Sequence, residues 1–129
     1  MAIHQDVVIN GTPKSVYDIL TGSKKFAAMT GGRTAKISKD EGGAVSMFGG
    51  DIHGRNVELV PGKRVVQAWR AGYWKEGVYS IVRFELVADG TRTKLSFDQT
   101  GHPADAQPDL ETGWHKMYWE PMNKMLGNA

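Results

Sequence analysis

The feature that most constrains the fold is an amphipathic segment near the C-terminal end of the sequence. At 100° per residue, its apolar side chains fall within about 80° of Trp114. These side chains are Leu110, Met117, Tyr118, Pro121, Met122 and Met125. The opposite side carries the polar residues Lys116, Glu120 and Asn123. The pattern predicts one long helix that presents an aromatic and methionine stripe to the interior of the protein.

Two residues of this segment depart from a simple amphipathic helix. Pro121 has no amide hydrogen, and its ring would crowd the carbonyl of Met117, so we expect a bend near the middle of the helix. Trp119 lies about 140° from the centre of the stripe, so we expect it outside the core face. There it would contribute to a partner surface or be half-covered by a loop.

The rest of the sequence shows the alternation and the turn signals of an antiparallel sheet. Alternation is clearest at 79–87 and 93–99, which are separated by the hairpin signal Asp89-Gly90. Further strands are expected at 3–9, 34–38, 44–48, 52–60 and 64–71, with a type II turn over residues 60–63. Successive hairpins indicate a meander.

Two short helices are expected after the first strand. Thr12-Pro13 is a typical start for the first of them, because Thr caps free amides and Pro suits the first helical position. The second begins at Ser23, carries Phe26 and Met29 inward and ends at Gly31-Gly32. Together these elements predict an α+β fold, in which a curved antiparallel sheet wraps around a long C-terminal helix.

Composition and charge are those of one globular domain over residues 1–129. Hydrophobic residues make up 40% and charged residues 23% of the 129 residues. The 16 basic and 14 acidic side chains are interspersed, which argues against the basic stripe of a nucleic-acid binder. The first ten residues lack the pattern of a signal peptide, and no apolar run approaches the roughly 18 residues that span a bilayer. We therefore expect a cytoplasmic protein without membrane insertion.

A long helix fills only part of the concave space of a curved sheet, so we expect an apolar cavity there. Bulky rings and flexible thioethers can border an irregular cavity, and a few inward polar groups would orient a ligand. The expected lining is Phe26, Met29, Gln67, Trp69, Phe84, Phe97, Gln99, Trp114, Met117 and Tyr118. A solid core is the alternative interpretation of the same stripe.

Catalytic and metal-binding patterns are weak in this sequence. It has no cysteine, and the spacing of its four histidines is not that of a helical metal site. We therefore expect no metal, no cofactor and no catalytic set. His102 is expected to support a turn or to be solvated rather than to touch a ligand, and His115 is expected to lie on the surface. An enzyme remains an alternative if Asp51, His53 or His115 faces the cavity.

The run GWHKMYWEP at residues 113–121 resembles the closing motif of START-like domains related to the activator of heat-shock protein 90 ATPase. Supporting segments at 49–54, 60–70, 79–84, 90–93 and 98–103 follow in the order of that family and cover nearly the whole chain. The resemblance implies the helix-grip fold of the START-like (SRPBCC) superfamily, with two small helices at the open end of the sheet. It also implies that the concave interior is a hydrophobic ligand cavity.

These observations favour a non-catalytic carrier or sensor of an apolar small molecule, lipid-like or aromatic. Two alternatives remain open. One is an enzyme of the cyclase or dehydratase kind, which similar helix-grip domains can be. The other is an interaction protein, either a co-chaperone or a homodimer, for which Trp74 and Trp119 would supply exposed contacts. The eukaryotic activator has a further N-terminal domain that contributes to chaperone binding, and we expect no counterpart of it here.

Overall fold

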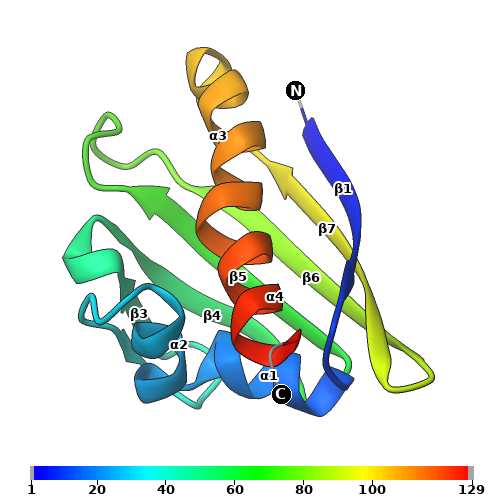
Figure 1. Ribbon diagram of the computed structural model, residues 1–129. Coiled ribbons are helices and arrows are strands. Elements are labelled where there is room, and N and C mark those ends of the chain that lie inside the picture. Colours follow the sequence, from blue (N-terminus) through cyan, green and yellow to red (C-terminus); the bar gives the residue numbers. More distant parts are fainter. Residues whose placement is uncertain (1, 128–129) are drawn as a thin grey trace.

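A computed structural model describes residues 2–127, and its largest element is a seven-stranded antiparallel sheet (Figure 1). The strands are β1 (Ala2–Ile9), β2 (Lys36–Ile37), β3 (Ala44–Met47), β4 (Ile52–Val60), β5 (Arg64–Ala71), β6 (Ser80–Asp89) and β7 (Arg92–Thr100). Their order across the sheet is β1-β7-β6-β5-β4-β3-β2. Strands β2 to β7 therefore form the predicted meander. The first strand joins it beside β7, with Ala2 opposite Thr100.

Helices cover one face of the sheet (Figure 1). The two predicted short helices, α1 (Pro13–Thr21) and α2 (Ser23–Met29), follow β1. A long helical run follows β7 and consists of η2 (Ala104–Ala106), α3 (Gln107–Trp114), η3 (His115–Trp119) and α4 (Glu120–Gly127). In Figure 1 this run crosses the strands from orange to red, with α1 and α2 near its C-terminal end. The architecture is the predicted helix-grip fold.

Local sequence explains where several elements begin and turn. Thr12 caps α1, because its hydroxyl oxygen accepts a hydrogen bond from the amide of Ser15 at 3.2 Å, and Pro13 occupies the first helical position. Between β4 and β5, Gly62 has a φ of +71°, which a residue without Cβ adopts freely. Among residues 2–127, no helix is both long and apolar enough to cross a bilayer.

The core lies between the helical run and the inner face of the sheet. As predicted, every second residue of the central strands points inward and is buried. These residues are Ser80, Val82, Phe84 and Leu86 in β6, and Thr93, Leu95, Phe97 and Gln99 in β7. The outer face carries exposed residues between them, as expected of an antiparallel sheet that is covered on one side.

The helical run is interrupted by a π turn, η3, immediately before Pro121. At the end of this turn the amide of Glu120 donates to the carbonyl of His115, five residues earlier. In a regular α-helix the ring of Pro121 would crowd the carbonyl of Met117, and a widened turn relieves this contact. The irregularity predicted near mid-helix is therefore a π turn.

The π turn changes which side chains face the core. One extra residue in a turn retards all later side chains by about 100°, the rotation of one helical residue. Trp119 consequently points inward and is only 2% exposed, so the prediction that it lies outside the core face is wrong. Met117 and Met125, predicted to face inward, are 42% and 40% exposed.

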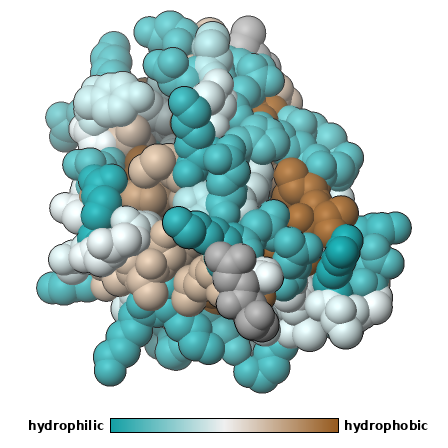
Figure 2. Space-filling model, in the orientation of Figure 1, coloured by the Kyte–Doolittle hydropathy of each residue, from teal (hydrophilic) through white to brown (hydrophobic). Residues whose placement is uncertain are grey.

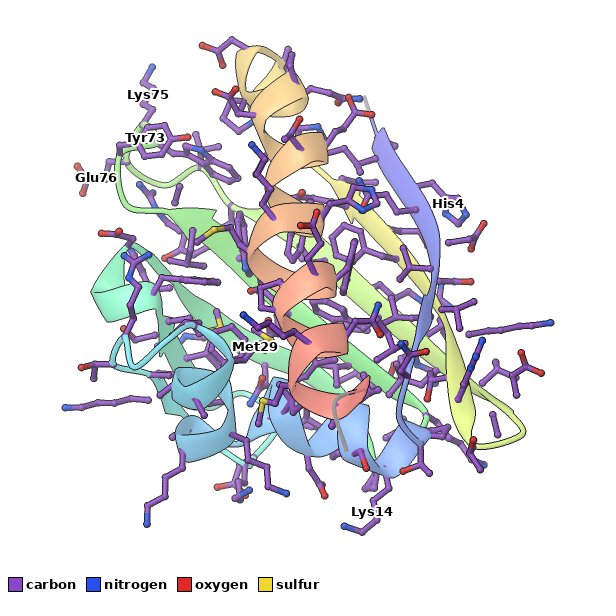
Figure 3. The ribbon with its side chains drawn as sticks, in the orientation of Figure 1. His4, Lys14, Met29, Tyr73, Lys75 and Glu76 are labelled. Atoms are coloured by element: carbon purple, nitrogen blue, oxygen red, sulfur yellow. The ribbon has the colours of Figure 1, made fainter. Side chains whose placement is uncertain are left out.

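Trp74 is also buried, contrary to the prediction that it supplies an exposed contact. It lies in the loop between β5 and β6, and its ring packs 5.8 Å from that of Trp69. The guanidinium of Arg70 holds this loop by donating to the carbonyl of Trp74 at 2.6 Å. Tyr73 is exposed instead, and Figure 3 shows it projecting from the loop with Lys75 and Glu76 nearby.

The shifted helical face predicts a specific order of stability effects. Trp119→Ala should lower the free energy of unfolding by about 3–5 kcal/mol, because it removes a fully buried ring. Met125→Ala should lower it by less than about 1 kcal/mol, because this side chain is partly exposed. Chemical denaturation measures both values. A larger loss for Met125→Ala than for Trp119→Ala would contradict the π turn and would support a helix with regular periodicity.

Candidate functional site

An apolar pocket of about 220 Å³ opens between the helical run, the start of β4 and the end of β5. Its apolar lining side chains are Phe48, Ile52, Trp69, Leu110, Trp114, Met117 and Tyr118. Three charged residues, Arg33, Asp51 and Asp109, also line it. On the face shown in Figure 2, hydrophobic atoms are recessed among hydrophilic ones on the left, the side on which η1 (Phe48–Gly50) lies in Figure 1.

The η1 side of the pocket is built on strained backbone. Phe48 has a φ of +55°, a conformation that costs a residue other than glycine about 1–3 kcal/mol. Its ring packs edge-on against Phe26 at 5.4 Å and lies 5.6 Å from the ring of Tyr118. Such strain persists only where surrounding contacts hold the residue, and it concentrates at functional sites.

Arg33 ties the charged rim to this strained turn. Its guanidinium donates to the carbonyl of Phe48 at 2.7 Å and to the carboxylate of Asp51 at 2.6 Å. It also lies over the Phe48 ring, 5.4 Å from the ring centre. The Asp51 side chain is 74% exposed, so the ion pair adds little stability. Its role is geometric, because it positions Arg33 at the mouth of the pocket.

The indole of Trp114 is fixed by a buried chain of hydrogen bonds. Its Nε1 donates to Oε1 of Gln99 at 2.8 Å, and Nε2 of Gln99 donates to Oγ of Ser80 at 3.0 Å. Oγ of Ser80 donates in turn to the backbone carbonyl of Trp69 at 2.7 Å. The wall that Trp114 forms is therefore held rigidly on the sheet.

Tyr118 places a phenol in the wall of the pocket. Its hydroxyl oxygen accepts a hydrogen bond from Nε1 of Trp69 at 3.4 Å. Burial raises the pKa of the Tyr118 phenol above its ordinary value, because the charged form would lose its hydration. The phenol is therefore neutral at physiological pH.

Four of the ten residues predicted to line a cavity border this pocket: Trp69, Trp114, Met117 and Tyr118. The other six, Phe26, Met29, Gln67, Phe84, Phe97 and Gln99, lie elsewhere in the buried core. Met29, labelled in Figure 3, lies where α2 meets the helical run. The amides of Gln67 and Gln99 find protein partners, since Nε2 of Gln67 donates to Oδ1 of Asn56 at 3.3 Å.

The sequence reasoning missed the η1 side of the pocket and one glycine of the helix. Phe48 gave no signal, because its inward direction depends on the strained turn. Gly113 did carry one, since glycine inside a helix lowers stability by roughly 1 kcal/mol and calls for a reason. A Cβ built on Gly113 meets no atom within 4 Å, so the glycine leaves space open beside the pocket.

The three candidate titratable groups of the enzyme alternative are not brought together. Asp51 is at the rim, paired with Arg33. His53 borders a separate hollow beside Arg70 and Tyr79, and His115 is exposed. Among residues 2–127, no group of three His, Cys, Asp or Glu side chains could hold a metal ion. His102 is buried, with Nε2 2.6 Å from Oε1 of Gln107, so of the two roles expected for it the structure favours the turn-supporting one over the solvated one.

The contribution of the buried hydrogen bonds around Trp114 to stability can be tested by substitution. Gln99→Leu keeps the approximate volume but leaves the Trp114 N–H without its acceptor, so it should lower the free energy of unfolding by about 1–3 kcal/mol. Thr100→Val, at the exposed neighbouring position, should change it by less than about 0.5 kcal/mol. Thermal and chemical denaturation report both effects. Equal effects of the two variants would mean that the buried chain of hydrogen bonds contributes nothing to the free energy of unfolding.

Comparison with known proteins finds matches to one protein family. The family model described as "Activator of Hsp90 ATPase homolog 1-like protein" matches residues 10–127. The activator of 90 kDa heat shock protein ATPase homolog of Dictyostelium discoideum is 36% identical over 106 residues, which are 81% of this chain and 27% of that protein. Human homolog 1 is 28% identical over 116 residues, 90% of this chain and 34% of its own length. The chain thus spans well under half the length of these curated relatives.

Two solved structures share the fold over nearly their whole length. A protein of Plasmodium falciparum described as an HSP90 activator superposes with a TM-score of 0.93 at 22% identity, covering 98% of this chain and 96% of that one. The Aha1 dimer of Colwellia psychrerythraea has a TM-score of 0.81 at 16% identity, covering 100% and 99%. At these identities the likeness demonstrates the fold alone.

Proposed function

The chain belongs to the family of activator of Hsp90 ATPase homolog 1-like proteins, and on that premise we propose that it binds a small, largely apolar molecule in the pocket beside α3. The role is that of a non-catalytic carrier or sensor. The observation that carries the proposal is the pocket of about 220 Å³ with its aromatic and aliphatic walls. Such apolar concavities with a few polar groups are the usual sites for small ligands.

The size and rigidity of the pocket support a ligand that contains a ring. An apolar cavity of about 150 Å³ in another protein accepts benzene, so about 220 Å³ has room for a substituted ring. Trp69 and Trp114 present flat walls, with ring centres 5.1 Å apart. Met117 adds a flexible side chain that can adapt to different ligand shapes.

Gly113 supports the proposal from the energetics of the helix. A residue with a side chain would stabilise α3 at this position, and nothing in the surroundings opposes a Cβ. The glycine instead keeps the pocket open. Phe48, which also lines the pocket, supports the same conclusion through its strained backbone. Both residues lower the stability of the fold at positions that border the pocket.

Filling the pocket from Gly113 tests the proposal. Gly113→Leu should weaken binding of acetophenone at least about tenfold, because the new side chain occupies the site, while the free energy of unfolding stays equal or rises by up to about 1 kcal/mol. Titrations followed by the indole N–H signals in NMR spectra give the affinity. Thr112→Leu adds the same side chain at the exposed neighbouring position and should leave binding unchanged.

Two results would contradict the proposal. One is a failure of the unaltered protein to bind acetophenone or other small aromatic compounds. The other is a loss of about 1–3 kcal/mol in Gly113→Leu, the usual effect of overpacking, which would mean that no open space exists beside the helix.

A second candidate function is favoured by the relatives. Proteins described as activators of a 90 kDa heat shock protein ATPase match 81% and 90% of this chain. We propose, as this second candidate, that the chain acts on an Hsp90-type chaperone, alone or as a homodimer. Trp74 and Trp119 are buried, so a chaperone contact would use other surface residues.

ATP hydrolysis by an Hsp90-type chaperone tests the second candidate. Added in excess, the protein should raise the hydrolysis rate, and sedimentation should detect the complex and any dimer of the protein alone. The Gly113→Leu variant separates the two functions, because a surface contact should survive when the pocket is filled. Absence of both stimulation and complex formation would refute this candidate.

A further inference from the structure

Two residues that line the pocket, Trp69 and Tyr118, carry hydrogen-bond donors that are incompletely used. Nε1 of Trp69 donates to the Tyr118 hydroxyl oxygen at 3.4 Å, longer than the usual N–H···O range of about 2.7–3.2 Å. The indoles of Trp114 and Trp119 make much shorter bonds, at 2.8 Å and 2.7 Å. The Trp69 N–H is therefore only weakly satisfied.

The hydroxyl hydrogen of Tyr118 is also unused. Tyr118 is 3% exposed, and among residues 2–127 the Trp69 indole is its one hydrogen-bond partner. In that bond the hydroxyl oxygen accepts, so its own hydrogen has no acceptor within the described part of the chain. A buried donor in this state lowers stability and calls for an explanation. Since the phenol is neutral, the hydrogen is present and can be donated.

The charged rim limits which acceptor can enter. It carries two carboxylates, Asp51 and Asp109, against the single guanidinium of Arg33. Arg33 is already engaged with Asp51 and the Phe48 carbonyl. An anionic ligand would therefore meet a rim of net negative charge and no free cation among the residues lining the pocket. An uncharged acceptor avoids both the repulsion and the cost of burying a charge.

We propose that the pocket selects neutral aromatic carbonyl compounds, whose ring packs against Trp69 and Trp114 while the carbonyl oxygen accepts from Tyr118 Oη and Trp69 Nε1. The proposal rests on ligand binding in this pocket and adds the chemical class of the ligand. Tyr118 acts as the specificity-determining residue, because an apolar molecule of the same shape leaves its hydroxyl unpaired.

A pair of isosteric probes tests the specificity. Acetophenone carries the carbonyl, and α-methylstyrene replaces its C=O by C=CH₂ with nearly the same shape. Tyr118→Phe should weaken acetophenone binding about threefold to tenfold, the contribution of one hydrogen bond, and leave α-methylstyrene binding unchanged or slightly stronger. Benzoate, the anionic analogue, should bind more weakly than acetophenone to the unaltered protein. Circular dichroism checks that the variant is folded.

An infrared measurement provides a second readout that does not depend on affinity. The carbonyl stretching band of bound ¹³C-labelled acetophenone should move to lower frequency than in an alkane solvent, and most of this shift should disappear in Tyr118→Phe. If neither probe binds the unaltered protein, the ligand-binding function itself fails. In a second outcome, both probes bind, Tyr118→Phe alters their affinities equally and the carbonyl band is unshifted. That result would overturn the specificity proposal but leave ligand binding in the pocket supported.

Discussion

The indole of Trp114 is the contact on which the helix, the sheet and the pocket all depend. Its ring centre lies 4.2 Å from that of Phe97 and 4.4 Å from that of Tyr118, so it joins the sheet to the helical run. Its N–H is bound to Gln99, which fixes the orientation of the ring. The same side chain borders the pocket. One residue therefore takes part both in the packing of the core and in the wall of the site.

The π turn divides the helical run into two parts with different roles. Before it, α3 contributes Leu110 and Gly113 to the pocket and leaves the space beside them unfilled. After it, the shifted face of α4 packs Met122 fully into the core, and Trp119 at the end of the turn is buried as well. In a helix with regular periodicity, Trp119 would lie about 140° from the centre of the apolar stripe and could not be buried on the same face as Trp114. The irregularity thus separates an open half of the interior from a solid half.

Prediction from the sequence succeeded for the fold, and four of the ten residues expected to line a cavity border the pocket. Alternation and turn chemistry are local properties, so the strands, α1, α2 and the meander could be placed from the residues alone. The cavity was expected in the concave space of the sheet, with Phe84 and Phe97 in its lining, yet these two rings pack with centres 5.2 Å apart and do not line the pocket. The pocket exists where the helical run and η1 diverge. Gln67 and Gln99 looked like ligand contacts because their partners, Asn56 and Ser80, lie on other strands.

The sequence by itself determined the antiparallel meander that wraps around a long C-terminal helix, because periodicity, caps and turns act over a few residues and agree with one another. It also determined that Trp114 is central, since the stripe is centred on that residue. Only the tertiary structure decided the direction of Trp119 and the position of the pocket. The direction of Trp119 depends on the π turn, and the η1 side of the pocket depends on the strained backbone of Phe48. Contacts between residues that are distant in the chain hold Phe48 in this conformation.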